Sequence, residues 1–328
     1  MRLLSAEDVR QAVPMTAAID AVEAAFVSLA SNQAEVPLRT HIPAPEHEGM
    51  SLFMPARIND PAVSALGVKV VSIFPRNLGR GLPTINALVN LFDPQTGQAL
   101  AVLDGTYLTA LRTGAASGVA TRHLARADAR VLALFGAGAQ AMPQALAVCA
   151  VRPIERIWLV NRSRERAQLL AARMRGAGLT LDLRLATSSE QALAEADVVC
   201  TATSALHPLF SDPMLKPGTH INAIGAYKPT MAEVPPASVA RARVFVDQTE
   251  AAWAEAGDLI QARDAGLISS NHLAGEIGAV AAGFLAGRIS AEEITLFKSV
   301  GSAAQDLAVA TLAVARAHAL GLGTEVAW

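Results

Sequence analysis

The sequence is poor in cysteine, in aromatic residues and in net charge. Its 328 residues include two cysteines, too few for a disulfide framework or a zinc cage, and this favours a reducing compartment such as the cytoplasm. Aromatic residues make up 4%, and 27 basic against 29 acidic residues give a net charge of -2. Such a chain lacks the basic surface and the stacking platforms that a nucleic-acid-binding protein needs.

We also expect neither a targeting segment nor a membrane span. Acidic Glu7 and Asp8 occupy the place where a signal peptide would carry its apolar run. The uncharged stretch 131–151 is long enough to cross a bilayer, but glycine, proline and glutamine interrupt it and its first half is typical of a strand. The seven histidines show no metal-ligand spacing, so no metal site is predicted. Because 52% of the residues are hydrophobic and 17% are charged, we predict a large buried core.

The first third of the chain predicts an α+β domain. Apolar residues at helical spacing indicate a helix over residues 15–29, and a second helix is predicted over 106–124. Between them lie short apolar runs that proline and glycine separate, as in a mainly antiparallel sheet. These runs are residues 51–54, 67–73, 87–92 and 99–103.

From residue 130 onward, buried strands alternate with helices, which predicts a doubly wound parallel sheet of the Rossmann type. Strands are expected at 130–135, 156–160, 196–201, 219–224, 244–247 and 294–298, with helices at 139–151 and 164–175. The helix at 302–319 comes too late for this sheet, so we expect it to return to the first domain and, with Trp328, to serve packing and dimer contacts. The expected domains are 1–118 plus 302–328, for substrate binding and dimerisation, and 119–301, for dinucleotide binding.

The sequence GAGAQA at residues 136–141 is the clearest local motif. It fits the dinucleotide-binding pattern G-x-G-x-x-G/A, and it follows an apolar strand and opens a helix, the context that supports such a match. Gly136 would permit the tight turn, and Gly138 would let the backbone approach a pyrophosphate. Ala139 and Gln140 would place backbone N–H groups at the positive end of the helix.

The end of the second strand indicates which dinucleotide is bound. An NAD site normally carries an acidic residue there for the ribose 2′-hydroxyl, whereas this chain has Asn161, Arg162 and Ser163. Without the carboxylate a 2′-phosphate is not repelled, and the arginine and the hydroxyl provide partners for it. We therefore predict NADP(H), with NAD(H) as the alternative if these residues only solvate a helix start.

Residues 108–117, LTALRTGAAS, closely resemble the signature of the ornithine cyclodeaminase/mu-crystallin family. Further matches follow in order over nearly the whole chain: PLR at 37–39, MP at 54–55, GVK at 67–69, LPT at 82–84, TATS at 201–204, NAIGA at 222–226 and FKSVG at 297–301. The resemblance implies a homodimer in which a substrate-binding domain, built from the N-terminal third and the last helix, is joined to a Rossmann domain.

The resemblance also assigns roles to single residues. Arg39, Lys69 and Arg112 would hold the α-carboxylate of an amino-acid-like substrate, and a buried carboxylate does need such partners. Each of these cations taken alone is equally consistent with a surface charge. Positions in the matching motifs that would contact the dinucleotide are Thr84, Arg112, Thr203, Gly225 and Ser299.

Three departures from the cyclodeaminase pattern bear on the substrate. Tyr227 stands where cyclodeaminases carry the aspartate that serves the substrate amines, Leu52 stands where a second acid is expected, and Lys298 replaces an aspartate. A bound ornithine would then bring a terminal ammonium that no carboxylate meets, and an unpaired buried charge costs several kcal/mol. The departures favour a substrate without a distal cation.

These observations predict an NAD(P)H-dependent reductase of cyclic ketimines or small 2-imino acids, for example Δ1-pyrroline-2-carboxylate, as in the mu-crystallin branch of the family. Lys69, Tyr227 or water would donate the proton. One alternative is ornithine cyclodeaminase, which recycles its bound nicotinamide, with neutral drift at the three positions. The other is a non-catalytic, NADPH-bound protein like a crystallin.

Overall fold

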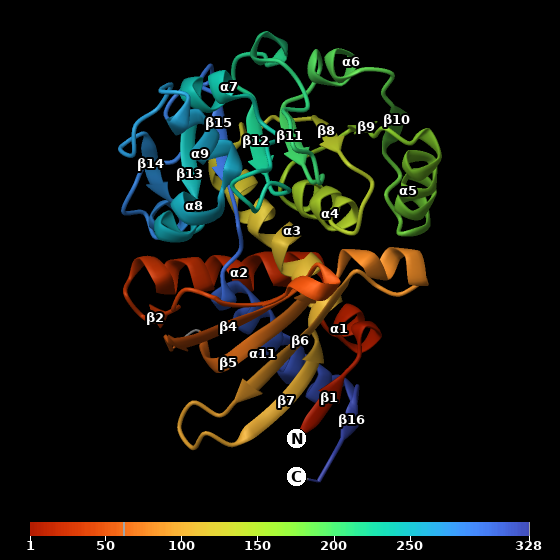
Figure 1. Ribbon diagram of the computed structural model, residues 1–328, viewed down its shortest axis with the longest axis vertical. Coiled ribbons are helices and arrows are strands. Elements are labelled where there is room, and N and C mark those ends of the chain that lie inside the picture. The colour runs from red at the N-terminus through yellow and green to blue at the C-terminus, as the bar shows by residue number, and fades with distance from the viewer. Residues whose placement is uncertain (62, 328) are drawn as a thin grey trace. The chain divides into compact units, whose positions relative to one another are not determined.

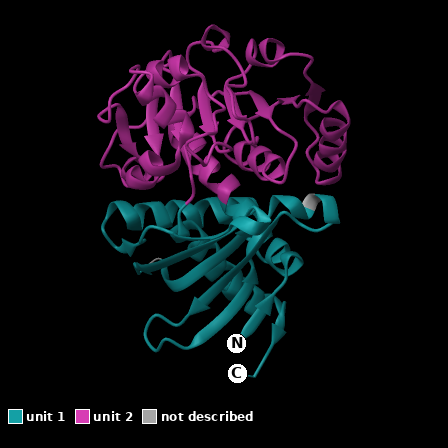
Figure 2. Cartoon of the chain, in the orientation of Figure 1, with its two compact units in different colours: residues 1–112, 302–328 teal, residues 113–301 magenta. Residues whose placement is uncertain are grey.

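The computed structural model describes residues 1–61 and 63–327, so the expectation for Trp328 lies outside the described residues. The chain forms two compact units (Figures 1 and 2). Unit 1 contains residues 1–112 and 302–328, and unit 2 contains residues 113–301. The division lies within one helix, α3 (Gly105–Leu124), whose first turns belong to unit 1.

Unit 1 is built on a mostly antiparallel sheet, as predicted. Within the described residues it has eight strands, with the path β16-β1-β7-β6-β5-β4-β2 and β3 paired to β4, and only the β1–β7 pair is parallel. The strands are β1 (Arg2–Leu4), β2 (Ala34–Glu35), β3 (Thr40–Ala44), β4 (Gly49–Asn59), β5 (Ser64–Ile73), β6 (Ile85–Phe92), β7 (Ala99–Asp104) and β16 (Thr324–Glu325).

Helices cover one face of this sheet. α11 (Ala303–Leu320) contacts β4, β5 and β6, and it also contacts α1 (Ala6–Ala12) and α2 (Met15–Ala30) (Figure 1). Strand side chains alternate between two faces, so Leu52 and Met54 are buried whereas Phe53 between them is 36% exposed. Short 3₁₀ helices, η1 (Pro45–His47) and η2 (Pro75–Arg80), lie in the connections.

Unit 2 is a doubly wound sheet, which confirms the predicted Rossmann fold class. Its eight described strands follow the order β10-β9-β8-β11-β12-β15-β13-β14, and every pair is parallel. The strands are β8 (Val131–Phe135), β9 (Arg156–Val160), β10 (Asp182–Leu185), β11 (Val198–Thr201), β12 (His220–Ala223), β13 (Arg243–Val246), β14 (Leu273–Glu276) and β15 (Thr295–Lys298).

Both faces of this sheet are buried, which explains why its central strands are apolar at nearly every position. Ala133 and Phe135 of β8 belong to one hydrophobic core, and Leu132 and Leu134 belong to another. The helices of unit 2 are α4 (Ala141–Val151), α5 (Arg164–Gly176), α6 (Ser189–Leu193), α7 (Pro236–Arg241), α8 (Thr249–Glu255), α9 (Gly257–Asp264) and α10 (Ile277–Ala281), with the 3₁₀ helix η3 (Asp212–Met214).

Several expectations need correction. The helix predicted from residue 139 begins at Ala141, because residues 137–140 form a turn before it. β10 and β14 were not predicted, since neither is a continuous apolar run. The uncharged stretch 131–151 is β8 followed by α4. No single helix in the described part is long and apolar enough to cross a membrane, and the pair α1 and α2, which passes only by length and composition, is bent by 89°.

Candidate active site

The predicted dinucleotide residues of unit 2 follow the carboxyl ends of β8, β9, β11, β12 and β15. β8 lies between β9 and β11, so the strand order reverses at β8, and ligands bind in such a crevice in open α/β sheets. Gly136 has a φ of +105°, and a Cβ atom there would lie 2.5 Å from the carbonyl oxygen of Ala202. A Cβ atom on Gly225 would lie 2.2 Å from the carbonyl oxygen of Thr203. Glycine is therefore required at both positions, because the loops touch each other there.

The turn after β8 fits a dinucleotide. A Cβ atom on Gly138 would meet nothing within 4 Å, so the backbone is open to approach there. α4 begins after Gln140 without a hydrogen bond from a side-chain cap, which leaves backbone N–H groups of its first turn for a phosphate. Ala139 is exposed in the same turn.

The segment after β9 carries no carboxylate at the expected place. Asn161 donates from Nδ2 to the carbonyl oxygen of Ser163 at 2.8 Å, and Arg162 is exposed. The Ser163 hydroxyl caps α5 by accepting from the Arg166 backbone N–H at 3.2 Å. Ser163 thus serves the helix start, and Arg162 is the residue of this segment that presents a charge to solvent.

A buried carboxylate, Glu233, joins two of the loops. It accepts from the Thr201 hydroxyl at 2.9 Å, from the backbone and hydroxyl of Thr203 at 2.6 and 2.8 Å, and from the Gly225 N–H at 2.6 Å. Burial raises the pKa of Glu233, while the nearby Lys298 ammonium acts in the opposite direction. Glu233 was not predicted from the sequence, and it fixes the positions of Thr203 and Gly225 relative to each other.

The last residue of β15 and the residues after it are also held by buried acids. Lys298 forms an ion pair with Asp258, so the lysine that departs from the cyclodeaminase pattern has a partner within unit 2. The Ser299 hydroxyl donates to Asp247 at 2.7 Å, and the same carboxylate oxygen accepts from the Gly301 N–H. The Ser299 side chain is therefore directed at Asp247.

In unit 1 two of the predicted carboxylate-binding residues meet at a third side chain. Lys69 of β5 is 2% exposed, and its Nζ lies 2.7 Å from Oδ2 of Asp306. Arg112 of α3 donates from Nε to Oδ1 of Asp306 at 2.9 Å and from Nη1 to Oε1 of Gln305 at 2.7 Å. Asp306 and Gln305 lie in the first turn of α11 and are completely buried.

Lys69 titrates near neutrality. Burial lowers its pKa from 10.5 to about 7, the positive charges of Arg112 and Arg39 act in the same direction, and Asp306 opposes them. Arg39 is thus close enough to Lys69 to act on it electrostatically. The structure therefore brings Lys69 and Arg112 together at Asp306, and the charge of Arg39 also acts on Lys69.

The expectation of a site with no acid needs revision, because Asp306 contributes a carboxylate to this cluster. Its Oδ2 faces Lys69, and its Oδ1 faces Arg112.

Leu52 is buried on the same face of the sheet as Lys69. Met54, two residues after Leu52, pairs with Lys69, and residues two apart in a strand share a face. Thr84 precedes β6, and its carbonyl oxygen accepts from the Phe74 N–H at 2.8 Å. Tyr227, in unit 2, is 38% exposed.

One compositional signal points to the buried cations. The chain has only four lysines, at positions 69, 216, 228 and 298, among its 27 basic residues. Lys69 and Lys298 are the two that are almost or completely buried, and each faces a buried aspartate. Asp306 itself carries no such signal, because an acid in the first turn of a helix is commonplace.

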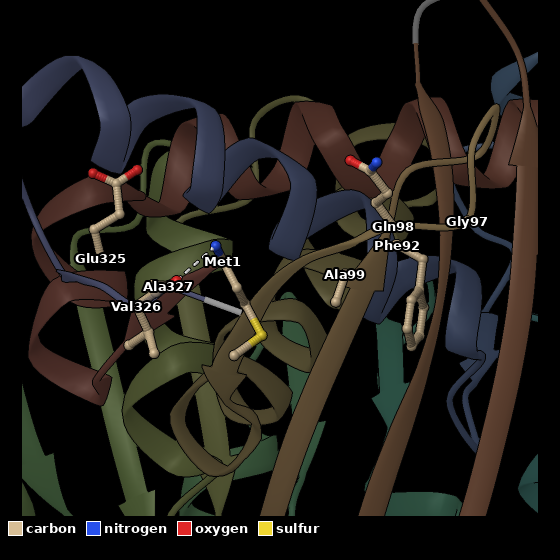
Figure 3. A pocket seen from close by; sticks show the side chains of 8 residues that line it. All are labelled: Met1, Phe92, Gly97, Gln98, Ala99, Glu325, Val326 and Ala327. Atoms are coloured by element: carbon tan, nitrogen blue, oxygen red, sulfur yellow. Dashed lines mark hydrogen bonds between the residues drawn. The ribbon is translucent and has the colours of Figure 1, made fainter.

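A pocket of unit 1 lies apart from this cluster. It has a volume of about 850 Å³ and is lined by residues of the chain ends and of the turn before β7: Met1, Phe92, Gly97, Gln98, Ala99, Glu325, Val326 and Ala327 (Figure 3). None of the predicted site residues lines it. Within residues 1–61 and 63–327, no group of three or more histidine, cysteine, aspartate or glutamate side chains is arranged to hold a metal ion.

Known proteins resemble this chain over its whole length. The sequence profile of the ornithine cyclodeaminase/mu-crystallin family matches residues 1–320. A Delta(1)-pyrroline-2-carboxylate reductase of Bacillus cereus is 40% identical over 327 residues, which are 99% of either chain.

Solved structures agree with this. The Delta(1)-pyrroline-2-carboxylate reductase of Thermococcus litoralis, in complex with NADH and L-proline, has a TM-score of 0.95 and 39% identity, and the match covers 99% of this chain and 100% of that one. An archaeal alanine dehydrogenase dimer with bound NAD has a TM-score of 0.92 and 34% identity, covering 100% and 99%. The relatives confirm the predicted fold class and family.

Proposed function

The chain belongs to the ornithine cyclodeaminase/mu-crystallin family, and on this premise we propose that it is an NAD(P)H-dependent reductase of cyclic ketimines and small 2-imino acids. The reaction would convert Δ1-pyrroline-2-carboxylate to proline. The observation that carries the proposal is the buried cluster of Lys69 and Arg112, which an acid of the chain orients. The likeness to reductases over the full chain supports the same reaction class.

A buried cation cluster suits a small carboxylate substrate. Arg112 has an anchored guanidinium, whose planar fork pairs well with carboxylate oxygens, and Lys69 and Arg39 add positive charge. Asp306 is a single carboxylate between the two cations Lys69 and Arg112, so this pair keeps positive charge for an anion. Arg39, Lys69 and Arg112 would hold the substrate by its carboxylate and orient the adjacent C=N carbon.

Reduction of a C=N bond needs a hydride at carbon and a proton at nitrogen. A reduced nicotinamide supplies the hydride when it is bound. Because the pKa of Lys69 is about 7, this residue is present both as ammonium and as amine near neutral pH. It can therefore hold the carboxylate or release a proton toward the imine nitrogen, with Tyr227 and water as the other donors.

The surroundings of the cluster favour an imino acid over a diamine. Leu52 places an apolar side chain on the Lys69 face, and the carboxylate of Asp306 already faces two cations. A distal ammonium would need a carboxylate of its own, since a desolvated unpaired charge is costly. Tyr227 offers a hydroxyl without a charge at neutral pH. These features weigh against ornithine cyclodeamination.

Unit 2 would hold the dinucleotide. Gly136, Gly138, Ala139 and Gln140 would cradle the pyrophosphate, and Thr203, Gly225 and Ser299 would contact the nicotinamide half. Preference for NADP(H) rests on the absence of a carboxylate after β9 and on the exposed Arg162 beside Asn161 and Ser163. NAD(H) is the alternative, and the solved relatives contain NADH or NAD.

One face of the unit 1 sheet supports the proposal of a homodimer. Ile42, Phe53 and Leu88 lie on strands β3, β4 and β6 and are 52%, 36% and 53% exposed. Phe53 of β4 and Leu88 of β6 both pair with Val70 of β5, so they flank Val70 from the two neighbouring strands. An apolar sheet face of this kind favours burial against a second copy of the chain.

The test is a cofactor and substrate panel followed at 340 nm. We expect steady-state oxidation of NADPH or NADH with Δ1-pyrroline-2-carboxylate or Δ1-piperideine-2-carboxylate. Turnover of neither imine, together with ammonia release from ornithine and no net change of cofactor, would instead identify a cyclodeaminase. Tight dinucleotide binding without any turnover would identify a binding protein. Gain of ornithine activity in Tyr227→Asp would mark Tyr227 as the residue that sets specificity.

A further inference from the structure

Asp306 occupies the centre of the unit 1 cation cluster. Its side chain is completely buried, with Oδ1 2.9 Å from Arg112 Nε and Oδ2 2.7 Å from Lys69 Nζ. One carboxylate on α11 therefore bridges a lysine on β5 and an arginine on α3, elements that are distant in the sequence.

Arg112 is anchored at two of its nitrogens. Besides the bond from Nε to Asp306, Nη1 donates to Oε1 of Gln305 at 2.7 Å. A guanidinium is planar, so two anchors on adjacent α11 residues fix its plane. In this proposal the third nitrogen, Nη2, faces the ligand, because α11 holds the other two. Nε2 of Gln305 is buried without a partner in the described part of the chain.

We propose that Asp306 is the positioning residue of the carboxylate clamp: it fixes the plane of Arg112 and keeps Lys69 charged in a buried place. The inference rests on the proposed function for the identity of the ligand, a small carboxylate. Asp306 does not touch the substrate in this proposal, because the two clamp cations already occupy both of its oxygens.

The electrostatic part follows from the groups that face Lys69. Arg112 from α3 and Arg39 from the segment before β3 are positive, and Asp306 from α11 is the one acid that acts on this lysine within the described residues. On the adjacent strands, Met54 of β4 and Val89 of β6 pair with Lys69 and are uncharged. Burial lowers the pKa of Lys69 to about 7 even with Asp306 in place. Without the negative charge the ammonium would be lost at still lower pH.

Asp306→Asn tests this with almost no change of shape. The asparagine can still accept from Arg112, but the negative charge is gone. In the pH profile of kcat/KM for Δ1-pyrroline-2-carboxylate, we expect the fall on the basic side, the basic limb, to move to lower pH by about one unit or more. KM should rise about tenfold at pH 8 and less at pH 6. The ionisation of the substrate is the same for both proteins and cancels in the comparison.

The control is Asp306→Asn made in a protein that already carries Lys69→Arg. A guanidinium stays charged throughout this range, so Asp306→Asn should then leave the position of the basic limb unchanged. Gln305→Leu is the second variant. It removes one anchor of Arg112 and keeps the Asp306 charge, so KM should rise at every pH without a shift of the limb. An unshifted limb in Asp306→Asn, or an unchanged KM in Gln305→Leu, overturns the proposal.

A second readout does not depend on turnover. Because the chain has four lysines, the ε-carbon resonances of protein labelled with ¹³C-lysine are few, and the signal missing in Lys69→Arg identifies Lys69. We expect its titration midpoint near pH 7, and a lower one in Asp306→Asn. A shifted midpoint without imine reduction would refute the proposed function alone. Imine reduction with an unmoved midpoint would refute the role of Asp306 alone.

Discussion

The ammonium of Lys298 lies 2.9 Å from Oδ2 of Asp258, and both side chains are completely buried in unit 2. The other oxygen of Asp258 accepts from the backbone N–H groups of Glu233 and Val234 at 2.7 and 3.0 Å. The ion pair therefore connects the end of β15 to the first turn of α9. Through Asp258 it also reaches Glu233, which joins the loops after β11 and β12.

Lys298→Met should destabilise the protein strongly, because it leaves the buried Asp258 carboxylate without its cation. We expect a loss of about 3–5 kcal/mol in the free energy of unfolding, measured by denaturant titration. Lys228→Met is the matched control: Lys228 is exposed, so its removal should change stability by less than about 0.5 kcal/mol. Equal stabilities of the two variants would contradict a stabilising role for the pair.

Glu233→Gln should weaken dinucleotide binding by loosening the loops after β11 and β12. The amide nitrogen of glutamine cannot accept a hydrogen bond, so at least one of the donors from Thr203 and Gly225 loses its partner. Each buried donor left unpaired costs about 1–3 kcal/mol.

The measurements for Glu233→Gln are the dissociation constant of NADPH, the melting temperature with and without NADPH, and KM for the imine. We expect the first to rise and the cofactor-induced gain in melting temperature to shrink. The imine KM, measured at saturating NADPH, should change little because Glu233 lies in the other unit from the carboxylate clamp. A lower melting temperature with unaltered NADPH affinity would show a structural role only.

Arg162→Ala should reduce the preference for NADP(H). Loss of one charge-assisted bond to a 2′-phosphate costs about 1.5–3 kcal/mol, so kcat/KM for NADPH should fall by roughly 10- to 100-fold. The value for NADH should stay near that of the unmodified protein. Arg175→Ala removes the same charge from the last turn of α5 and serves as the control. If both cofactors lose activity equally, Arg162 does not distinguish them.

Leu88→Lys should convert the proposed homodimer to a monomer. A lysine at this position of the unit 1 sheet would bring a charge into an apolar interface, next to Val70 and close to Phe53. Light scattering coupled to size exclusion measures the mass in solution. Leu169→Lys is the control, since Leu169 is 59% exposed on α5 of unit 2 and should leave the dimer intact. A dimer that survives Leu88→Lys would place the interface elsewhere.

The sequence predicted most of the elements around the dinucleotide residues, because local patterns specify them. β8 and β9 are apolar runs, GAGAQA requires a turn before a helix, and α2 and α3 show helical spacing. β10 was not predicted, because Asp182 and Arg184 alternate with leucines at an edge of the sheet. β14 was not predicted either, because Gly275 and a shift of register interrupt this short strand.

What the sequence determined by itself is the kind of protein: an α/β chain with a dinucleotide turn, three cations in motifs of one family, and no acid at the position of Tyr227. The groups that those cations face depend on the fold. Arg112 and Asp306 are separated by 194 positions, and nothing local at either residue indicates the other. A buried charge takes its properties from the groups that the fold packs around it, so the partner and the ionisation of Lys69 followed only once β5, α3 and α11 were in place.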